Sequence, residues 1–103
     1  MTDLDSATRA LHLVQRPDPG TLAACRAFCR PGDAVVLVDT GVLALCAGDG
    51  ISGFPPEVGM YCLHPDALAH GLAGEAASRG VVTIADADLV RLVMGHRHCL
   101  GWK

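Results

Sequence analysis

Four short apolar segments most constrain what this chain can fold into. Each is at most six residues long, rich in Leu, Ala or β-branched side chains, and bounded by polar, Gly or Pro residues. Continuous apolar runs of this length are typical of strands buried on both faces, which is the pattern of a parallel sheet. The segments cover residues 10–14, 34–38, 58–63 and 81–85.

Helical patterns separate these segments. The predicted helices cover residues 21–30, 41–47, 65–71 and 87–94, with Thr40 and Asp86 placed as caps and Pro65 at a first helical position. Strands that alternate with helices predict βαβ units with right-handed crossovers. We therefore expect one α/β domain over residues 1–103 with a mostly parallel central sheet of four or five strands flanked by short helices. Residues 96–103 would supply an edge strand or a docking arm, and the Gly- and Pro-rich residues 48–57 a surface loop.

Length and charge narrow the class of protein. A chain of 103 residues fits one domain, and only 18% of its residues are charged, below the roughly 25% of average soluble proteins. So little charge favours a surface partly covered by partner subunits over an ordinary monomer. The eight Lys and Arg residues are scattered, which argues against direct nucleic-acid binding. No apolar run approaches the roughly 20 residues of a membrane span, and residues 1–9 are polar, so we expect a flexible N-terminal extension and a cytoplasmic protein.

The cysteines give the first hint of chemistry. An odd number of them does not fit a secreted disulfide framework, and we expect most to be small buried hydrophobes. Cys25 and Cys29 are four residues apart on a predicted helix, with Arg26 and Arg30 beside them. One accessible thiolate with a lowered pKa suffices for a persulfide carrier, but the same spacing also fits two thiols that pack the helix onto the sheet. Without a second ligand pair it does not predict a zinc site.

The histidines suggest less. His12 lies inside the first predicted strand, where a histidine with satisfied hydrogen bonds in the core is the ordinary interpretation. His96, His98 and Cys99 are close together, but no further ligand follows, and we expect the basic end of the last helix rather than a metal site. No phosphate-binding loop or nucleophile elbow is present. The sequence therefore predicts neither a self-contained active site nor a metal or cofactor.

Several motifs in order along the chain resemble the TusB/DsrH family. They are Leu11-His12, Gly32-Asp33 before an apolar strand, Gly41-Val42, Cys-Leu-His-Pro-Asp-Ala-Leu-Ala-His-Gly-Leu at residues 62–72, Val-Val-Thr-Ile-Ala-Asp-Ala-Asp-Leu-Val-Arg-Leu-Val at residues 81–93, and the near-terminal Trp102. The match runs from residue 11 to residue 102. Two features depart from the family: residues 1–10 precede its usual start, and Thr40 stands where the family usually has Asp.

The resemblance implies a DsrE/F/H-like fold and a place in a cytoplasmic heterohexamer. Such a complex holds two copies each of this subunit, a DsrE/TusD-like subunit and a DsrF/TusC-like subunit. It passes persulfide sulfur to a TusE/DsrC-like acceptor, for 2-thiolation of the tRNA wobble uridine or for sulfur oxidation. The main sulfur-accepting cysteine of the family belongs to the larger partner, so the resemblance implies an accessory, non-catalytic subunit of a sulfurtransferase complex.

Cys25 is the candidate site residue that the resemblance singles out. It lies seven residues before Gly32, where DsrH-type members carry a cysteine, and it would be a persulfide carrier. Cys29 has no such counterpart. The alternative is a purely structural interaction subunit with no thiol chemistry of its own.

Overall fold

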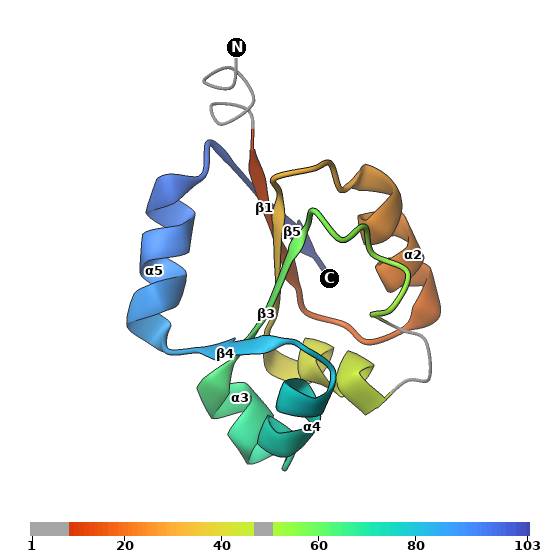
Figure 1. The fold of residues 1–103 in the computed structure, drawn as a ribbon, viewed down its shortest axis with the longest axis vertical. Coiled ribbons are helices and arrows are strands. Elements are labelled where there is room, and N and C mark those ends of the chain that lie inside the picture. The colour runs from red at the N-terminus through yellow and green to blue at the C-terminus, as the bar shows by residue number, and fades with distance from the viewer. Residues whose placement is uncertain (1–8, 47–50) are drawn as a thin grey trace.

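The computed structural model describes residues 9–46 and 51–103. Within them, five strands form one parallel sheet in the order β4-β3-β2-β1-β5 (Figure 1). The strands are β1 (Ala10–Val14), β2 (Ala34–Leu37), β3 (Gly59–Leu63), β4 (Val82–Ile84) and β5 (His98–Trp102). The predicted fold class is confirmed, and the tail forms the edge strand beside β1. The expected N-terminal extension falls almost wholly on residues 1–8, outside the described residues.

The connections between the strands are helical. They are α2 (Pro19–Phe28), the 3-10 helix η1 (Asp39–Cys46), α3 (His64–Ala69), α4 (Ala73–Ser78) and α5 (Asp86–Gly95). Helix α4 was not expected, because its sequence of Ala, Gly, Glu and Ser has no apolar periodicity. Among the described residues, no helix is long and apolar enough to cross a membrane.

Two of the predicted caps were wrong. Thr40 lies inside η1, and its hydroxyl donates to the carbonyl of Gln15 at 2.9 Å instead of capping the helix. Asp86 is already the first residue of α5; the carboxylate of Asp88 accepts from the backbone N–H of Ala85 at 3.1 Å. Side-chain oxygens often accept hydrogen bonds at the start of a helix, because the first backbone N–H groups have no partner inside the helix.

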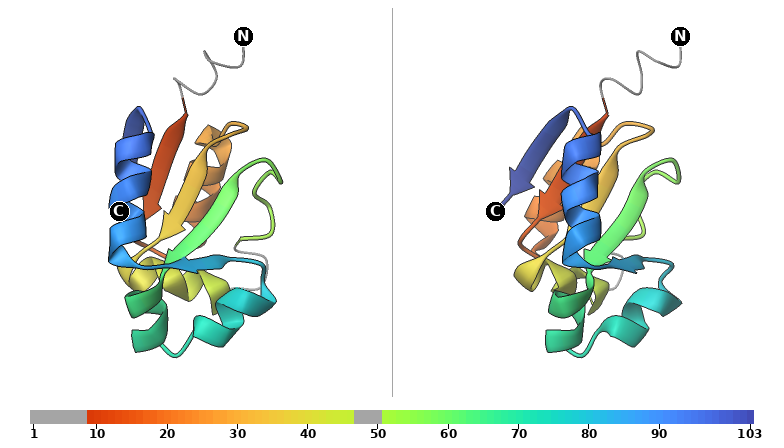
Figure 2. Two further views of the ribbon diagram at one scale, coloured as in Figure 1. Left: turned by 60° about the vertical axis from the view of Figure 1, so that its left-hand side comes forward. Right: turned by 90° about the vertical axis from the view of Figure 1, so that its left-hand side faces the viewer.

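The order of the strands places the helices in two layers. From β1 to β4 each strand is added on the same side of its predecessor, so right-handed crossovers put α2, η1, α3 and α4 on one face. The chain then returns across the sheet from β4 to β5, and α5 lies on the opposite face. Figure 2 shows the sheet between α5 in front and α2 behind.

Each face of the sheet has its own core. The α2 face holds the larger cluster, which includes Val14, Leu22 and Leu37. Ile51, Phe54 and Val58 also belong to it. The expected surface loop is confirmed for its described part, since residues 51–57 form neither helix nor strand and most of them are exposed, although Ile51 and Phe54 anchor the loop in this core. Residues 47–50 of that prediction lie outside the described residues.

The start of η1 is held against the end of β1. The carbonyl of Val14 accepts from the backbone N–H of Val38 at 3.0 Å, and Gly41 donates to the carbonyl of Val38 at 2.8 Å. A Cβ at Gly41 would collide with the backbone carbonyl of Val14. Only glycine therefore allows this approach, which explains the glycine at position 41.

Candidate functional site: a histidine and two thiols

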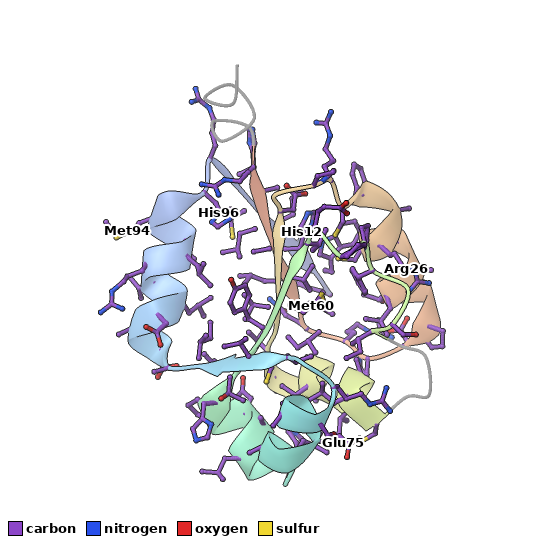
Figure 3. The ribbon with its side chains drawn as sticks, viewed as in Figure 1. His12, Arg26, Met60, Glu75, Met94 and His96 are labelled. Carbon is purple, nitrogen blue, oxygen red and sulfur yellow. The ribbon has the colours of Figure 1, made fainter. Side chains whose placement is uncertain are left out.

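His12 is buried in the middle of β1, with 1% of its surface exposed. Side chains alternate along a strand, so Leu11 and Leu13 lie in the α5-side core while His12 points to the α2 face. Figure 3 shows His12 on the side of the sheet that faces α2, far from Met94 of α5. A buried imidazole requires hydrogen-bond partners, because an unpaired polar group in a core is costly.

Asp33 supplies the first partner. It immediately precedes β2, it is 3% exposed, and its Oδ2 lies 3.0 Å from Nε2 of His12. Its carboxylate also accepts from the backbone N–H of Ala10 at 2.9 Å and of Arg30 at 3.1 Å. The carboxylate thus ties β1 to the turn before β2 and fixes the imidazole.

Trp102 supplies the second partner. Its indole Nε1–H donates to Nδ1 of His12 at 3.1 Å. Because an indole nitrogen only donates, Nδ1 accepts, and the ring proton lies on Nε2 and faces Asp33. Side chains from β1, β5 and the start of β2 therefore form one continuous chain of hydrogen bonds.

Two thiols complete the cluster. Cys25 is in the last turn of α2, and Cys29 is its C-cap residue, whose backbone N–H donates to the carbonyl of Cys25 at 3.1 Å. A nitrogen of His12 and the two sulfur atoms all lie within 4.8 Å of one another. Cys25 is 0% exposed and Cys29 is half-buried, so the two thiols differ in their access to solvent.

The thiols also differ in acidity. The neighbouring Cys25 is the largest influence that lowers the pKa of Cys29 to about 6; the nearby His12 acts in the same direction, and burial opposes both. The neighbouring Cys29 and burial raise the pKa of Cys25 well above its ordinary value. The two shifts have opposite directions: the surroundings favour the thiolate at Cys29 and the protonated thiol at Cys25.

The histidine and the carboxylate support the charged form of each other. Burial lowers the pKa of His12, but the neighbouring Cys29 and the hydrogen bond to Asp33 outweigh it and the pKa is raised. Burial raises the pKa of Asp33, but hydrogen bonds from Ala10, His12 and Arg30 outweigh it and the pKa is lowered. The indole of Trp102 acts against protonation of His12, because a second ring proton would remove its acceptor.

His12, Cys25 and Cys29 are residue types that hold soft metals such as zinc. Both nitrogens of His12 already take part in hydrogen bonds, to Asp33 and to Trp102. A metal ion would have to displace one of these bonds. We therefore describe the cluster as a hydrogen-bonded thiol site.

The expectation of a satisfied core histidine at position 12 is confirmed, but the sequence did not indicate its partners. Cys29 and burial raise the pKa of Cys25 and outweigh the charge of Arg26, which lowers it. The pKa of Cys29 is lowered by Cys25 and His12 and not by an arginine. The one feature of the sequence that pointed to this site was His12 itself, a polar side chain inside an apolar strand.

The other predicted residues lie apart from the cluster. Of the five cysteines, only Cys25 and Cys62 are buried, so the expectation that most are buried was wrong; Cys46 and Cys99 are exposed. His98 and Cys99 are on β5 rather than at a helix end, while the ring of His96 contacts the carbonyl of Leu92 at 2.7 Å.

Fold and site together define a small parallel α/β protein with a histidine-supported pair of thiols. The family described as DsrH like protein matches residues 17–99. Proteins named Protein TusB from Pectobacterium carotovorum subsp. carotovorum (strain PC1) and from Pectobacterium parmentieri are each 37% identical over 73 residues, which is 69% of this chain and 76% of the relative. The chain belongs to the DsrH-like family, as the motifs along its sequence indicated.

Proposed function

We propose that this protein is a subunit of a cytoplasmic sulfur relay in which persulfide sulfur passes from protein to protein. Its membership of the DsrH-like family, over residues 17–99, carries the proposal. The partners are homologous DsrE/TusD-like and DsrF/TusC-like subunits in a heterohexamer with two copies of each. A TusE/DsrC-like protein accepts the sulfur downstream.

The thiol site supports a chemical part for this subunit in the relay. Sulfane sulfur moves when a thiolate attacks it and a second thiolate leaves. Cys25, the predicted persulfide carrier, lies beside a second thiol and a hydrogen-bonded histidine. The subunit thus holds sulfur at this pair of thiols as an accessory to the main carrier of the larger partner subunit.

Reconstitution tests the proposal. The chain is co-expressed with the two homologous partner subunits, and the complex is loaded with a persulfide donor and mixed with the TusE/DsrC-like acceptor. We expect a heterohexamer and sulfur on the acceptor, read by intact mass. A chain that stays separate from both partners during size-exclusion chromatography would refute the proposal.

The destination of the sulfur separates two versions of this function. In one, the relay serves 2-thiolation of the tRNA wobble uridine, which fits the relatives named Protein TusB. In the other, it serves sulfur oxidation. Deletion of the gene followed by nucleoside analysis of tRNA decides between them: loss of 2-thiouridine supports the first, and intact 2-thiouridine with impaired sulfur oxidation supports the second.

A purely structural subunit is the alternative. The complete burial of Cys25 favours it, because an enclosed thiol meets no donor without movement. Replacing Cys25 by Ser in the reconstituted complex separates the two roles. Reduced transfer to the acceptor supports thiol chemistry in this subunit, whereas unchanged transfer with both Cys25 and Cys29 replaced by Ser supports the structural role.

A further inference from the structure

We propose that Cys29 is the thiol that accepts the incoming sulfane sulfur and that Cys25 is the resolving thiol of the same site. The inference deepens the proposed function and depends on it for the source of the sulfur. It reverses the order that the sequence suggested, in which Cys25 was the carrier and Cys29 was without a role.

The two thiols differ in their access to solvent. Cys25 is 0% exposed and belongs to the buried cluster that contains Leu22 and Val35. Cys29 is half-buried at the C-terminus of α2, beside exposed residues Phe28 and Arg30. An incoming persulfide therefore reaches the sulfur of Cys29 before it reaches that of Cys25.

The groups around Cys29 also favour its thiolate. Its sulfur lies within 4.8 Å of the sulfur of Cys25 and of a nitrogen of His12. These two neighbours favour the thiolate and lower the pKa of the Cys29 thiol to about 6. Asp33 and Trp102 hold the imidazole from its two nitrogens. They are positioning residues, because their hydrogen bonds fix the orientation of the imidazole.

The first step is a sulfur transfer without net oxidation. The Cys29 thiolate attacks the terminal sulfur of a persulfide donor, R–S–SH. A bond forms between Sγ of Cys29 and that sulfur, the S–S bond of the donor breaks, and R–S⁻ leaves. The product is Cys29–S–SH, and a thiolate of the downstream acceptor removes its outer sulfur in the same manner.

The second step takes place when no acceptor is present. The sulfur of Cys25 attacks Sγ of Cys29, and a Cys25–Cys29 disulfide forms while HS⁻ leaves with the proton of Cys25. The sulfane sulfur is reduced to hydrogen sulfide, and the two thiols are oxidised to the disulfide. Positions four apart face each other at a helix end, and Cys29 already has extended ψ of 140° as the C-cap residue, so the interior of α2 need not unwind.

Mass spectrometry with glutathione persulfide as the donor tests the order of the two thiols. The starting protein is the full chain with the exposed Cys46 and Cys99 replaced by Ser, to which Cys25→Ser or Cys29→Ser is added. The starting protein should gain one sulfur briefly and then end as a Cys25–Cys29 disulfide with one equivalent of sulfide released. Cys25→Ser should keep the added sulfur on Cys29, and Cys29→Ser should gain none.

Three results would overturn the inference. The first is sulfur on Cys25 of the Cys29→Ser variant at the rate of the starting protein. The second is a Cys25→Ser variant that loses its added sulfur as fast as the starting protein, and the third is a chain that takes no sulfur on either thiol. Co-purification of each variant with the partner subunits is measured in parallel: failure of sulfur loading with intact assembly refutes the inference alone, and failure of assembly by the unmodified chain refutes the proposed function.

Alkylation of the unmodified chain gives a readout that needs no variant. With limiting iodoacetamide at neutral pH, the peptide that carries Cys29 should be labelled about tenfold faster or more than Cys25, because the thiolate is the reactive form. Cys62, which is equally buried, is the internal control for accessibility. Faster labelling of Cys25 than of Cys29 would contradict the assignment.

Discussion

The two faces of the sheet are covered to very different degrees. On the α2 face, Leu22 and Cys25 of the helix are buried, and the core continues through η1, α3 and α4. On the opposite face α5 has no buried residue, and Leu89 and Leu92 only partly cover the sheet. The α2 face is therefore fully covered by its helices, and the α5 face is only partly covered.

The polar groups of the site lie on the fully covered α2 face. His12 and Asp33 have their hydrogen bonds satisfied inside that core, where low polarity strengthens them. Exposed apolar side chains occur on the helices of both faces, with Val90 and Met94 on α5 and Phe28 on α2. The difference in coverage indicates that rigidity is concentrated around the thiol site, and the following changes test this in order of expected size.

The largest contrast should come from equivalent truncations on the two faces. Leu22→Ala removes a side chain that is 2% exposed and should lower the free energy of unfolding by about 3 kcal/mol. Leu89→Ala, on the partly covered face, should cost about 1 kcal/mol. Urea denaturation of both variants measures the difference. Equal losses would mean that α5 is packed as firmly as α2.

Asp33→Asn should have the next largest effect, about 2 kcal/mol. Asp33 accepts three hydrogen bonds through its two oxygens, and an amide places its NH₂ group against at least one of those donors. Urea denaturation at pH 5 measures the loss. Asp88→Asn on α5, which removes the charge of an exposed carboxylate, is the matched control and should cost clearly less.

The effect of Asp33→Asn should also depend on pH. The folded-state pKa of Asp33 is lowered, so its stabilisation is present above the unfolded carboxyl range near about 4 and is lost as pH falls through the folded pKa. The folded-state pKa of His12 is raised, so its share is present below about 6.5 and is lost as pH rises through the folded pKa. The difference in free energy of unfolding between the unmodified chain and Asp33→Asn should therefore be largest between about pH 4 and 6.5. A difference that does not change with pH would contradict an ion pair between His12 and Asp33.

Trp102→Phe should cost about 1 kcal/mol, because it leaves Nδ1 of His12 without its donor. The ring remains to pack beside Phe28, whose centroid lies 5.6 Å from that of the indole. Trp102 is the one tryptophan of the chain, so its emission also reports the bond directly. In the unmodified chain the emission should change as pH falls and His12 gains a proton, and His12→Gln should abolish the change; a titration that survives in His12→Gln would refute the assignment.

The sequence predicted the features that depend on neighbouring residues and missed those that depend on distant ones. Apolar runs such as residues 34–38 are local signals, and they located the first four strands. The bond between Trp102 and His12 joins residues 90 positions apart, and it exists only because β5 pairs with β1. No local pattern carries that pairing. Helix α4 is local but was also missed. Its small residues show no apolar periodicity, although Ala76 is fully buried.

Cys29 shows a further limit of sequence reasoning. Its spacing from Cys25 was visible, but packing of the helix onto the sheet was the favoured interpretation, and the family resemblance gave Cys29 no role. What separates the two thiols is the end of α2 at Phe28, which leaves Cys29 half-exposed while Cys25 remains enclosed. A difference of one residue at a helix end is finer than helix ends can be placed from sequence.

The smallest effect on stability should come from the outer surface of α5. Val90 is 56% and Met94 is 81% exposed, so replacing both by Lys should change the free energy of unfolding by less than about 0.5 kcal/mol. We expect the isolated chain to self-associate, since it has little charge and a partly covered α5 face. Light scattering should then show less association for the double variant than for the unmodified chain. As a control, Thr83→Lys and Ala87→Lys add the same charge at exposed positions that are not large and apolar; equal improvement by both pairs would mean that net charge, and not the apolar face of α5, governs the association.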